Sequence, residues 1–259
     1  MLVDSHAHLD MPQFDADRED MLLRAVDIGV ESVLTIGMGN PQDNSIEKSL
    51  AIAEKYDFVH VGIGVHPHDA RLANESYWEE MESWSKHPKV VLWGEIGLDY
   101  YYKHSPTDVQ RDVFRRQLRM AQALNLPVAI HCREAWKDLM EILRLEWKPE
   151  NRGGILHSFT GTEDQAREAI AMGFLISFSG MITFKKADGL RQVAQSLAPD
   201  EFLVETDAPF LAPEPRRGRR NEPAFVVDVA SSLARARNES LEGLGDSTTR
   251  NFRRIIGLR

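Results

Sequence analysis

The sequence predicts an α/β protein of the (β/α)8, or TIM barrel, class. Short apolar segments alternate with amphipathic segments along the whole chain, and eight such units follow one another. This alternation is typical of parallel strands covered by helices on the outside. Eight units in 259 residues match the size of a TIM barrel. No linker, low-complexity run or block of like charges divides the chain, so we expect one domain over residues 1–259.

The first half of the chain supplies four of the expected units. Leu2 and Val3 begin a short apolar strand that ends at His6 and His8. Apolar residues recur at helical spacing over residues 17–29, where Gly29 is a suitable stop. The remaining strands of this half are predicted over residues 31–37, 58–65 and 90–96, with helices over 42–56, 75–86 and 107–124.

The second half repeats the pattern with shorter strands. We predict strands over residues 127–131, 154–157, 173–179 and 202–206, with helices over 134–145, 163–172 and 186–197. An irregular stretch with four prolines follows the last strand, and closing helices are predicted over residues 224–235 and 248–256.

A doubly wound open sheet is the alternative architecture. Its usual phosphate-binding fingerprint is missing, because the Gly37-x-Gly39 pair has no third glycine and the Gly62-x-Gly64 pair lies inside a predicted strand. The barrel is therefore the preferred prediction.

Composition excludes several classes of protein. With 42% hydrophobic and 27% charged residues the chain resembles an ordinary globular protein. Cys132 is the single cysteine, so no disulfide forms within the chain. No basic, apolar leader and no membrane-spanning run is present, so we expect a cytoplasmic protein without a membrane partner, and no feature indicates an obligate protein partner. A net charge of −9 argues against coating nucleic acid through the overall field, but it allows a local basic groove.

Candidate metal ligands stand where the predicted strands end. Because side chains two apart in a strand point to one side, His6 and His8 form an incipient metal site. In TIM barrels the chemistry lies at the C-terminal ends of the strands. The ligand-type residues at this rim exceed the needs of one tetrahedral site and suit two divalent cations, Zn²⁺, Mn²⁺ or Mg²⁺; they are His6, His8, Glu95, His131, His157 and Asp207.

Five segments in this order resemble the TatD family of metal-dependent deoxyribonucleases, within the amidohydrolase superfamily. They are residues 6–8 (HAH), 94–100 (GEIGLDY), 131–133 (HCR), 157–161 (HSFTG) and 205–209 (ETDAP). The similarity extends to residues 248–252 (TTRNF) and so covers essentially the whole chain. The resemblance implies a TIM-barrel hydrolase with two divalent metal ions.

The resemblance also implies a ligand set. One metal would be held by His6, His8 and Asp207, the other by His131 and His157, and Glu95 would bridge them. The implied activity is hydrolysis of phosphodiester bonds by a hydroxide held between the metals, with Asp207 orienting the attacking water or taking its proton. The implied substrate is single-stranded or frayed DNA cut in the 3′-to-5′ direction, with RNA left open.

Residues around the centre are candidates for substrate binding. His66 follows the third strand and Arg133 follows His131, and both are expected to contact phosphate. Arg217 belongs to the basic cluster 216–220, in a loop where TIM barrels often receive phosphate. Tyr101 is expected to stack on unpaired bases. For each of the four, loop packing, helix capping or solvation remains an alternative.

Two further residues near the rim receive an interpretation. Glu205 is expected to orient a metal ligand, because it lies two residues before Asp207 in the predicted strand. Cys132 is expected to be a buried strand-end residue and not a nucleophile.

Two other functions remain open on the sequence alone. An amide or ester hydrolase, such as an aminoacyl-tRNA deacylase, would use the same activated water on a carbonyl carbon. A metal-dependent nucleic-acid-binding module without catalysis would need fewer ligands than this rim offers.

Overall fold

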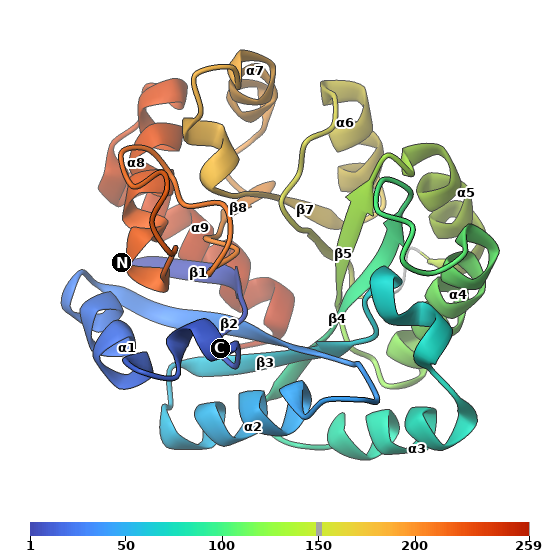
Figure 1. Cartoon of the computed structure of the whole chain (residues 1–259). Helices are drawn as coiled ribbons and strands as arrows, with labels where there is room; N and C mark the ends of the chain where they lie inside the picture. Colours follow the sequence, from blue (N-terminus) through green and yellow to red (C-terminus); the bar gives the residue numbers. More distant parts are fainter. Residues whose placement is uncertain (149–151, 259) are drawn as a thin grey trace.

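The computed structural model describes residues 1–148 and 152–258. Eight strands form one parallel sheet in which the order in space follows the order in sequence, from β1 to β8, and helices cover its outer face (Figure 1). The strands are β1 (Leu2–Ala7), β2 (Val30–Met38), β3 (Val59–Gly64), β4 (Val90–Asp99), β5 (Val128–Arg133), β6 (Gly154–Leu156), β7 (Phe174–Phe178) and β8 (Phe202–Val204).

Helices follow the strands in the alternation that the sequence predicts. They are α1 (Arg18–Asp27), α2 (Ser45–Lys55), α3 (Glu75–Trp84), α4 (Thr107–Ala123), α5 (Trp136–Glu146), α6 (Glu163–Ala171), α7 (Asp188–Ser196), α8 (Val226–Arg237) and α9 (Leu241–Ile256). Four short 3₁₀ helices lie in the described loops, namely η1 (Pro12–Phe14), η2 (Pro67–Leu72), η3 (Gly180–Thr183) and η4 (Pro223–Phe225). None of the described helices combines the length and the apolar character needed to cross a bilayer.

The sheet closes where the first strand meets the segment after the last one. Ala7 pairs in parallel with Ala208, the His8 amide donates to the Ala208 carbonyl at 2.8 Å, and the Asp207 amide donates to the His6 carbonyl at 2.9 Å. The predicted (β/α)8 barrel is therefore confirmed. Closure also brings the two ends of the rim together, so that His6 and Asp207 become neighbours.

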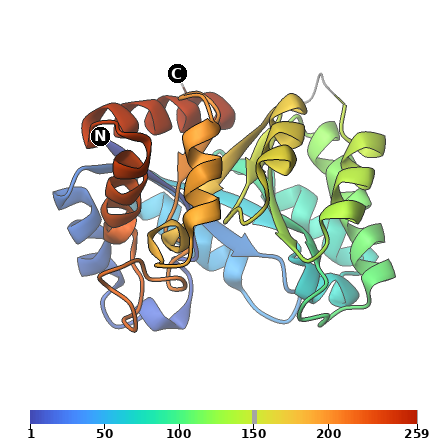
Figure 2. The same ribbon diagram turned by 90° about the horizontal axis from the view of Figure 1, so that it is seen from above.

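Two apolar layers hold the barrel together. The larger one packs the strands against the surrounding helices. The smaller one lies at the N-terminal ends of the strands, where α9 inserts Phe252, Ile255 and Ile256 against residues of β1, β2 and β4–β8, such as Val3 and Leu203. A view turned by 90° shows α9, in dark red, close to the N-terminus (Figure 2). Since this end is filled, the opposite rim is left for the loops that carry the chemistry.

Some predicted boundaries were wrong. The strand expected over residues 90–96 continues to Asp99, because Gly97, Leu98 and Asp99 pair with His131, Cys132 and Arg133 of β5. The helix expected over 248–256 begins at Leu241, where the Ser240 side chain caps the Gly243 amide at 3.0 Å. The helix expected over 224–235 begins with η4 and continues as α8 to Arg237.

Candidate metal centre

Glu95 lies at the centre of a cluster that contains all six predicted ligands. Its Oε2 atom is 3.2 Å from His6 Nε2 and 3.9 Å from His8 Nε2. Its Oε1 atom is 2.9 Å from His131 Nδ1 and 3.3 Å from His157 Nε2. The two carboxylate oxygens therefore face two different pairs of histidines, which is the arrangement that a bridging ligand needs.

Asp207 faces the first of these two pairs. Its Oδ1 atom is 3.5 Å from His8 Nε2 and 3.9 Å from His6 Nε2. Asp207 follows β8 with a positive φ of 59°, a left-handed conformation that aspartate tolerates better than most residues. This turn lets a carboxylate that follows the last strand reach His6 and His8, at the end of the first strand.

His66 lies closer to the cluster than the sequence analysis expected. It was predicted to contact substrate phosphate, but its Nε2 atom is 3.5 Å from Glu95 Oε1, and the residue is only 6% exposed. Three groups of side chains bring their ligand atoms within 4.8 Å of one another: His6–His8–Asp207, His66–Glu95–His131 and His6–His157–Glu205. His66 is thus a candidate ligand itself.

Two histidines of the cluster are each held by a second carboxylate. Glu205 Oε1 is 3.0 Å from His157 Nδ1 and also accepts from the Ser158 amide at 2.6 Å. Asp99 Oδ2 is 3.1 Å from His131 Nε2. Carboxylates in this position orient a ligating imidazole and raise its basicity. The contact of Glu205 agrees with its expected role.

Asp99 is a residue that the sequence analysis missed. It was expected in a loop, since the fourth strand was predicted to end at residue 96. In the structure it ends β4, and its Oδ1 atom accepts hydrogen bonds from the Tyr101 and Tyr102 amides at 3.0 and 2.9 Å. One signal for it was present in the sequence. Asp99 lies four residues after Glu95, so in a longer strand the two side chains point to the same face.

Burial and mutual attraction set the charges of the cluster. Burial by itself raises the pKa of Glu95, but the imidazoles of His157, His66 and His6 outweigh it and hold that pKa well below its usual range. Burial lowers the pKa of His157, but Glu95 and Glu205 outweigh it and raise that pKa well above the usual value. Burial lowers the pKa of His66 to about 4. The carboxylate at the centre is therefore ionised.

The chemistry of the donors fits divalent cations. His6 Nδ1 and Nε2, His8 Nδ1 and Glu205 Oε2 are buried and have no hydrogen-bond partner among the described residues. Buried polar atoms normally find a partner, so such a group of unpaired atoms marks a place where a ligand belongs. Imidazole nitrogens and carboxylate oxygens together suit Zn²⁺ and Mn²⁺, and Mg²⁺ less readily.

Arg133 and the tyrosines form an exposed platform beside the cluster. The Arg133 guanidinium lies 4.1 Å from the centroid of the Tyr101 ring and 4.7 Å from that of Tyr102, and both rings are about half exposed. The Tyr102 ring stacks on His104 with the ring planes 8° apart. Two of the predicted substrate contacts, Arg133 and Tyr101, are thus in contact with each other at the rim.

Two of the four arginines in the predicted basic cluster 216–220 form ion pairs within the protein. Arg216 pairs with Asp228 at 3.1 Å, and Arg220 pairs with Asp17 at 2.6 Å. Arg217 is exposed, and its guanidinium lies 4.1 Å from the Phe184 ring centroid. In the part of the chain that the structure describes, no hydrogen bond or ion pair involves the Arg217 side chain. It therefore keeps its charge available for a ligand.

A (β/α)8 barrel that carries a histidine–carboxylate cluster at the C-terminal ends of its strands defines a metal-dependent hydrolase. Residues 3–257 match the family model described as TatD related DNase, and the chain belongs to this family.

Relatives of known sequence agree over nearly the full length. The uncharacterized metal-dependent hydrolase YabD of Bacillus subtilis is 42% identical over 256 residues, covering 99% of either chain. The 3′-5′ ssDNA/RNA exonuclease TatD of Cronobacter sakazakii is 35% identical over 249 residues, covering 94% of this chain and 93% of its own. The crystal structure of YjjV, a TatD homologue from Escherichia coli, superposes with a TM-score of 0.92 at 28% identity, covering 100% of this chain and 98% of its own.

Proposed function

We propose that this protein is a metal-dependent exonuclease that removes nucleotides from the 3′ end of single-stranded or frayed DNA, with RNA as a further substrate. The observation that carries the proposal is the position of Glu95, whose two oxygens face two separate groups of histidines. The direction and the type of nucleic acid follow the name of the relative from Cronobacter sakazakii.

The family resemblance implies which residues would hold each metal, and the distances support the first group and suggest His66 as an addition to the second. His6, His8 and Asp207 would form one site and His131 and His157 the other, with Glu95 between them and His66 as an additional ligand of the second site. Two divalent cations bound there would neutralise charge on a phosphate and lower the pKa of a water.

The chain's own residues would then carry the hydrolysis. The side chain of Asp207 is 13% exposed against 4% for Glu95, so it is the carboxylate better placed to orient a water and take its proton. The water oxygen forms a bond to phosphorus, the bond from phosphorus to the oxygen of the neighbouring sugar breaks, and that oxygen takes up a proton from solvent and leaves as a hydroxyl group. Arg133 and Arg217 supply cationic groups for phosphate, as guanidinium does well.

The exposed aromatic residues favour an unpaired strand. Tyr101 and Tyr102 are 53% and 51% exposed beside Arg133. Stacking of a base on an aromatic side chain is worth about 1–3 kcal/mol and tolerates any base. The proposed enzyme therefore prefers single strands and shows little sequence preference.

The decisive experiment uses 5′-labelled single-stranded DNA and protein stripped of metal with a chelator. Mg²⁺, Mn²⁺ or Zn²⁺ is restored one at a time, beside a His131→Ala variant. We expect a ladder that shortens from the 3′ end and is lost in the variant. Absence of cleavage with every metal, in protein shown to be folded and metal-loaded, would overturn the proposal, and aminoacyl-tRNA would be the next substrate to test.

A further inference from the structure

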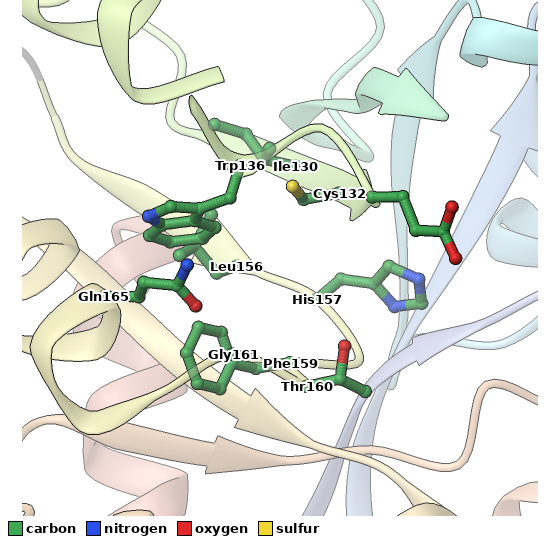
Figure 3. Close-up of a pocket in the computed structure, with 10 residues that line it drawn as sticks. Ile130, Cys132, Trp136, Leu156, His157, Phe159, Thr160, Gly161 and Gln165 are labelled. Atoms are coloured by element: carbon green, nitrogen blue, oxygen red, sulfur yellow. The ribbon is translucent and has the colours of Figure 1, made fainter. Parts of the chain in front are cut away.

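A cavity of about 310 Å³ lies beside the metal centre, between the ends of β5 and β6. Figure 3 shows Trp136 and Gln165 on one side of it, His157 on the other, and Phe159 with Thr160 along a third edge. The volume is at the small end of the range of ligand pockets, about 300–1,000 Å³. It suits a single ring system and not a longer stretch of substrate.

Part of the cavity wall is flat and apolar, and the rest is polar. The rings of Trp136 and Phe159 meet edge to face, with their centroids 6.0 Å apart. Ile130 and Leu156 are fully buried and complete the apolar lining. Aromatic walls of this kind accept a planar, aromatic ligand by stacking.

Gln165 is one of the polar residues in this lining, together with Glu134, His157 and Thr160. Its Oε1 atom accepts a hydrogen bond from the Thr162 amide at 2.9 Å and caps α6, so only its amide NH₂ group is free to act on a ligand. In Figure 3 the side-chain nitrogen of Gln165 is directed toward Trp136. A planar ligand held by Trp136 would therefore meet a hydrogen-bond donor at its edge. Carbonyl and ring-nitrogen acceptors on the edges of nucleobases suit such a donor.

His157 connects the cavity to the metal centre. It lines the cavity, and its Nε2 atom is 3.3 Å from Glu95 Oε1. A group seated in the cavity is thus separated from the bridging carboxylate by one imidazole ring. In a nucleotide, the base and the adjacent phosphate are separated by a single sugar, so one nucleotide can occupy both places.

We propose that this cavity binds the unpaired nucleobase of the nucleotide next to the phosphate that is cut, with Trp136 as the stacking surface and Gln165 as the donor to the edge of the base. The inference rests on the proposed nuclease function and names the part of the substrate that the site recognises.

Binding of a nucleoside tests the cavity without any cleavage. Thymidine carries a base but no phosphate, so it should quench the fluorescence of Trp136 in metal-free protein. The quenching should disappear in Trp136→Phe and persist in the matched control Trp84→Phe, a residue of α3 outside the cavity. Quenching that persists in Trp136→Phe, or no quenching in the wild-type protein, would overturn the base site.

Cleavage of a modified end tests the same site during turnover. Wild-type protein should cut a strand with a normal 3′-terminal nucleotide about tenfold faster than one whose last nucleotide lacks its base. Trp136→Ala should cut both at the same rate. Equal rates in the wild-type protein would overturn the base site and leave the nuclease standing. Thymidine quenching in a protein that cuts no nucleic acid would overturn the nuclease and support the base site.

A conservative variant guards against loss of folding. Gln165→Glu keeps an oxygen for the Thr162 amide, so the cap of α6 is retained, but it replaces the free donor by an acceptor. It should shift binding toward cytidine, whose exocyclic amino group donates, and away from thymidine. An unchanged ratio of the two affinities in a folded variant would show that Gln165 does not contact the base.

Discussion

Two of the histidines around Glu95 contact a carboxylate with each of their ring nitrogens. His131 has Glu95 on one nitrogen and Asp99 on the other, and His157 has Glu95 on one and Glu205 on the other. A carboxylate behind an imidazole selects the tautomer and prevents the ring from rotating. The orientation of these two proposed ligands is therefore built into the protein itself.

Replacement of Asp99 by asparagine tests this orientation at the level of one residue. The Asn side-chain oxygen can still accept from the Tyr101 and Tyr102 amides, but the atom that faces His131 is no longer charged. We expect Asp99→Asn to weaken metal binding about 10- to 100-fold, measured by competition with a chromophoric chelator. Asp112→Asn, on the exposed face of α4, is the control and should not change the affinity. An unchanged affinity in Asp99→Asn would show that Asp99 does not position His131.

Among the elements, the contact between β4 and β5 decides how the centre is assembled. Gly97 pairs with His131 across this contact and has a φ of 138°, which side chains rarely adopt. A Cβ atom at Gly97 would lie 2.0 Å from the His131 carbonyl oxygen. Of the proposed metal ligands, His131 lies opposite this position on β5 and Glu95 lies two residues before it on β4.

Gly97→Ala should therefore lower both stability and metal affinity. We expect the free energy of unfolding to fall by about 3 kcal/mol, because backbone atoms cannot give way as a flexible side chain can. Urea denaturation measures this loss. Gly189→Ala is the matched control: it lies in α7 with open space around it and should gain about 0.5–1 kcal/mol. Equal stabilities of Gly97→Ala and the wild-type protein would contradict the packing described.

His60 gives β3 a pH-dependent stability. Burial, helped by the nearby charge of Lys89, lowers the pKa of His60 to about 4 in the folded protein, whereas an unfolded histidine has its ordinary value of 6.5. The unfolded chain therefore binds a proton first as the pH falls, and stability is lost between pH 6.5 and about 4. At pH 5 the contribution of His60 to this loss is on the order of 2 kcal/mol.

The comparison of His60→Gln with the wild-type protein isolates this effect. Unfolding in urea at pH 7.5 gives the difference due to packing alone, because His60 is then neutral in both states. At pH 5 the variant should have gained about 2 kcal/mol relative to the wild-type protein. A difference that is the same at both pH values would show that His60 does not titrate as described.

At the scale of the whole molecule, a net charge of −9 means that a polyanionic substrate has to be held by local cations. Arg216 and Arg220 are neutralised by Asp228 and Asp17, while the side chains of Arg217 and Arg219 form no ion pair among the described residues. Of the free arginines, we expect Arg217 and Arg133, which lies on the tyrosines, to contact phosphate. Binding should therefore depend only weakly on salt, as expected for a protein that contacts about two phosphates.

Salt dependence measures how many phosphates are contacted. For single strands the slope of log(kcat/KM) against log[KCl], at saturating metal, should be about −1.4 in the wild-type protein. Arg217→Gln should bring it to about −0.7. Arg250→Gln, on α9 at the opposite end of the barrel, should leave it unchanged. A slope that does not change in Arg217→Gln would show that this arginine contacts no phosphate.

Several features of this protein follow from its sequence alone. The alternation of apolar strands and amphipathic helices predicts the barrel, because periodicity is a local property of the chain. The six candidate metal ligands could be identified because the C-terminal ends of parallel strands share one rim of a barrel; they are His6, His8, Glu95, His131, His157 and Asp207. Strand and helix boundaries were less accurate where pairing decided them, as at Gly97, which continues β4 only because β5 lies beside it.

Other features depend on contacts between distant segments and arise only in the folded molecule. Asp99 faces His131 and Glu205 faces His157 across 32 and 48 residues. The sequence predicts that Glu205 orients a ligand, but which histidine each carboxylate meets is decided by the fold. Likewise, the four arginines of the cluster 216–220 cannot be distinguished from one another in the sequence, but their partners in the folded protein differ. Asp17 is 203 residues from Arg220 and reaches it only because the barrel closes between β1 and β8. The sequence thus determines which groups reach the rim, and barrel closure decides which of them remain free to act.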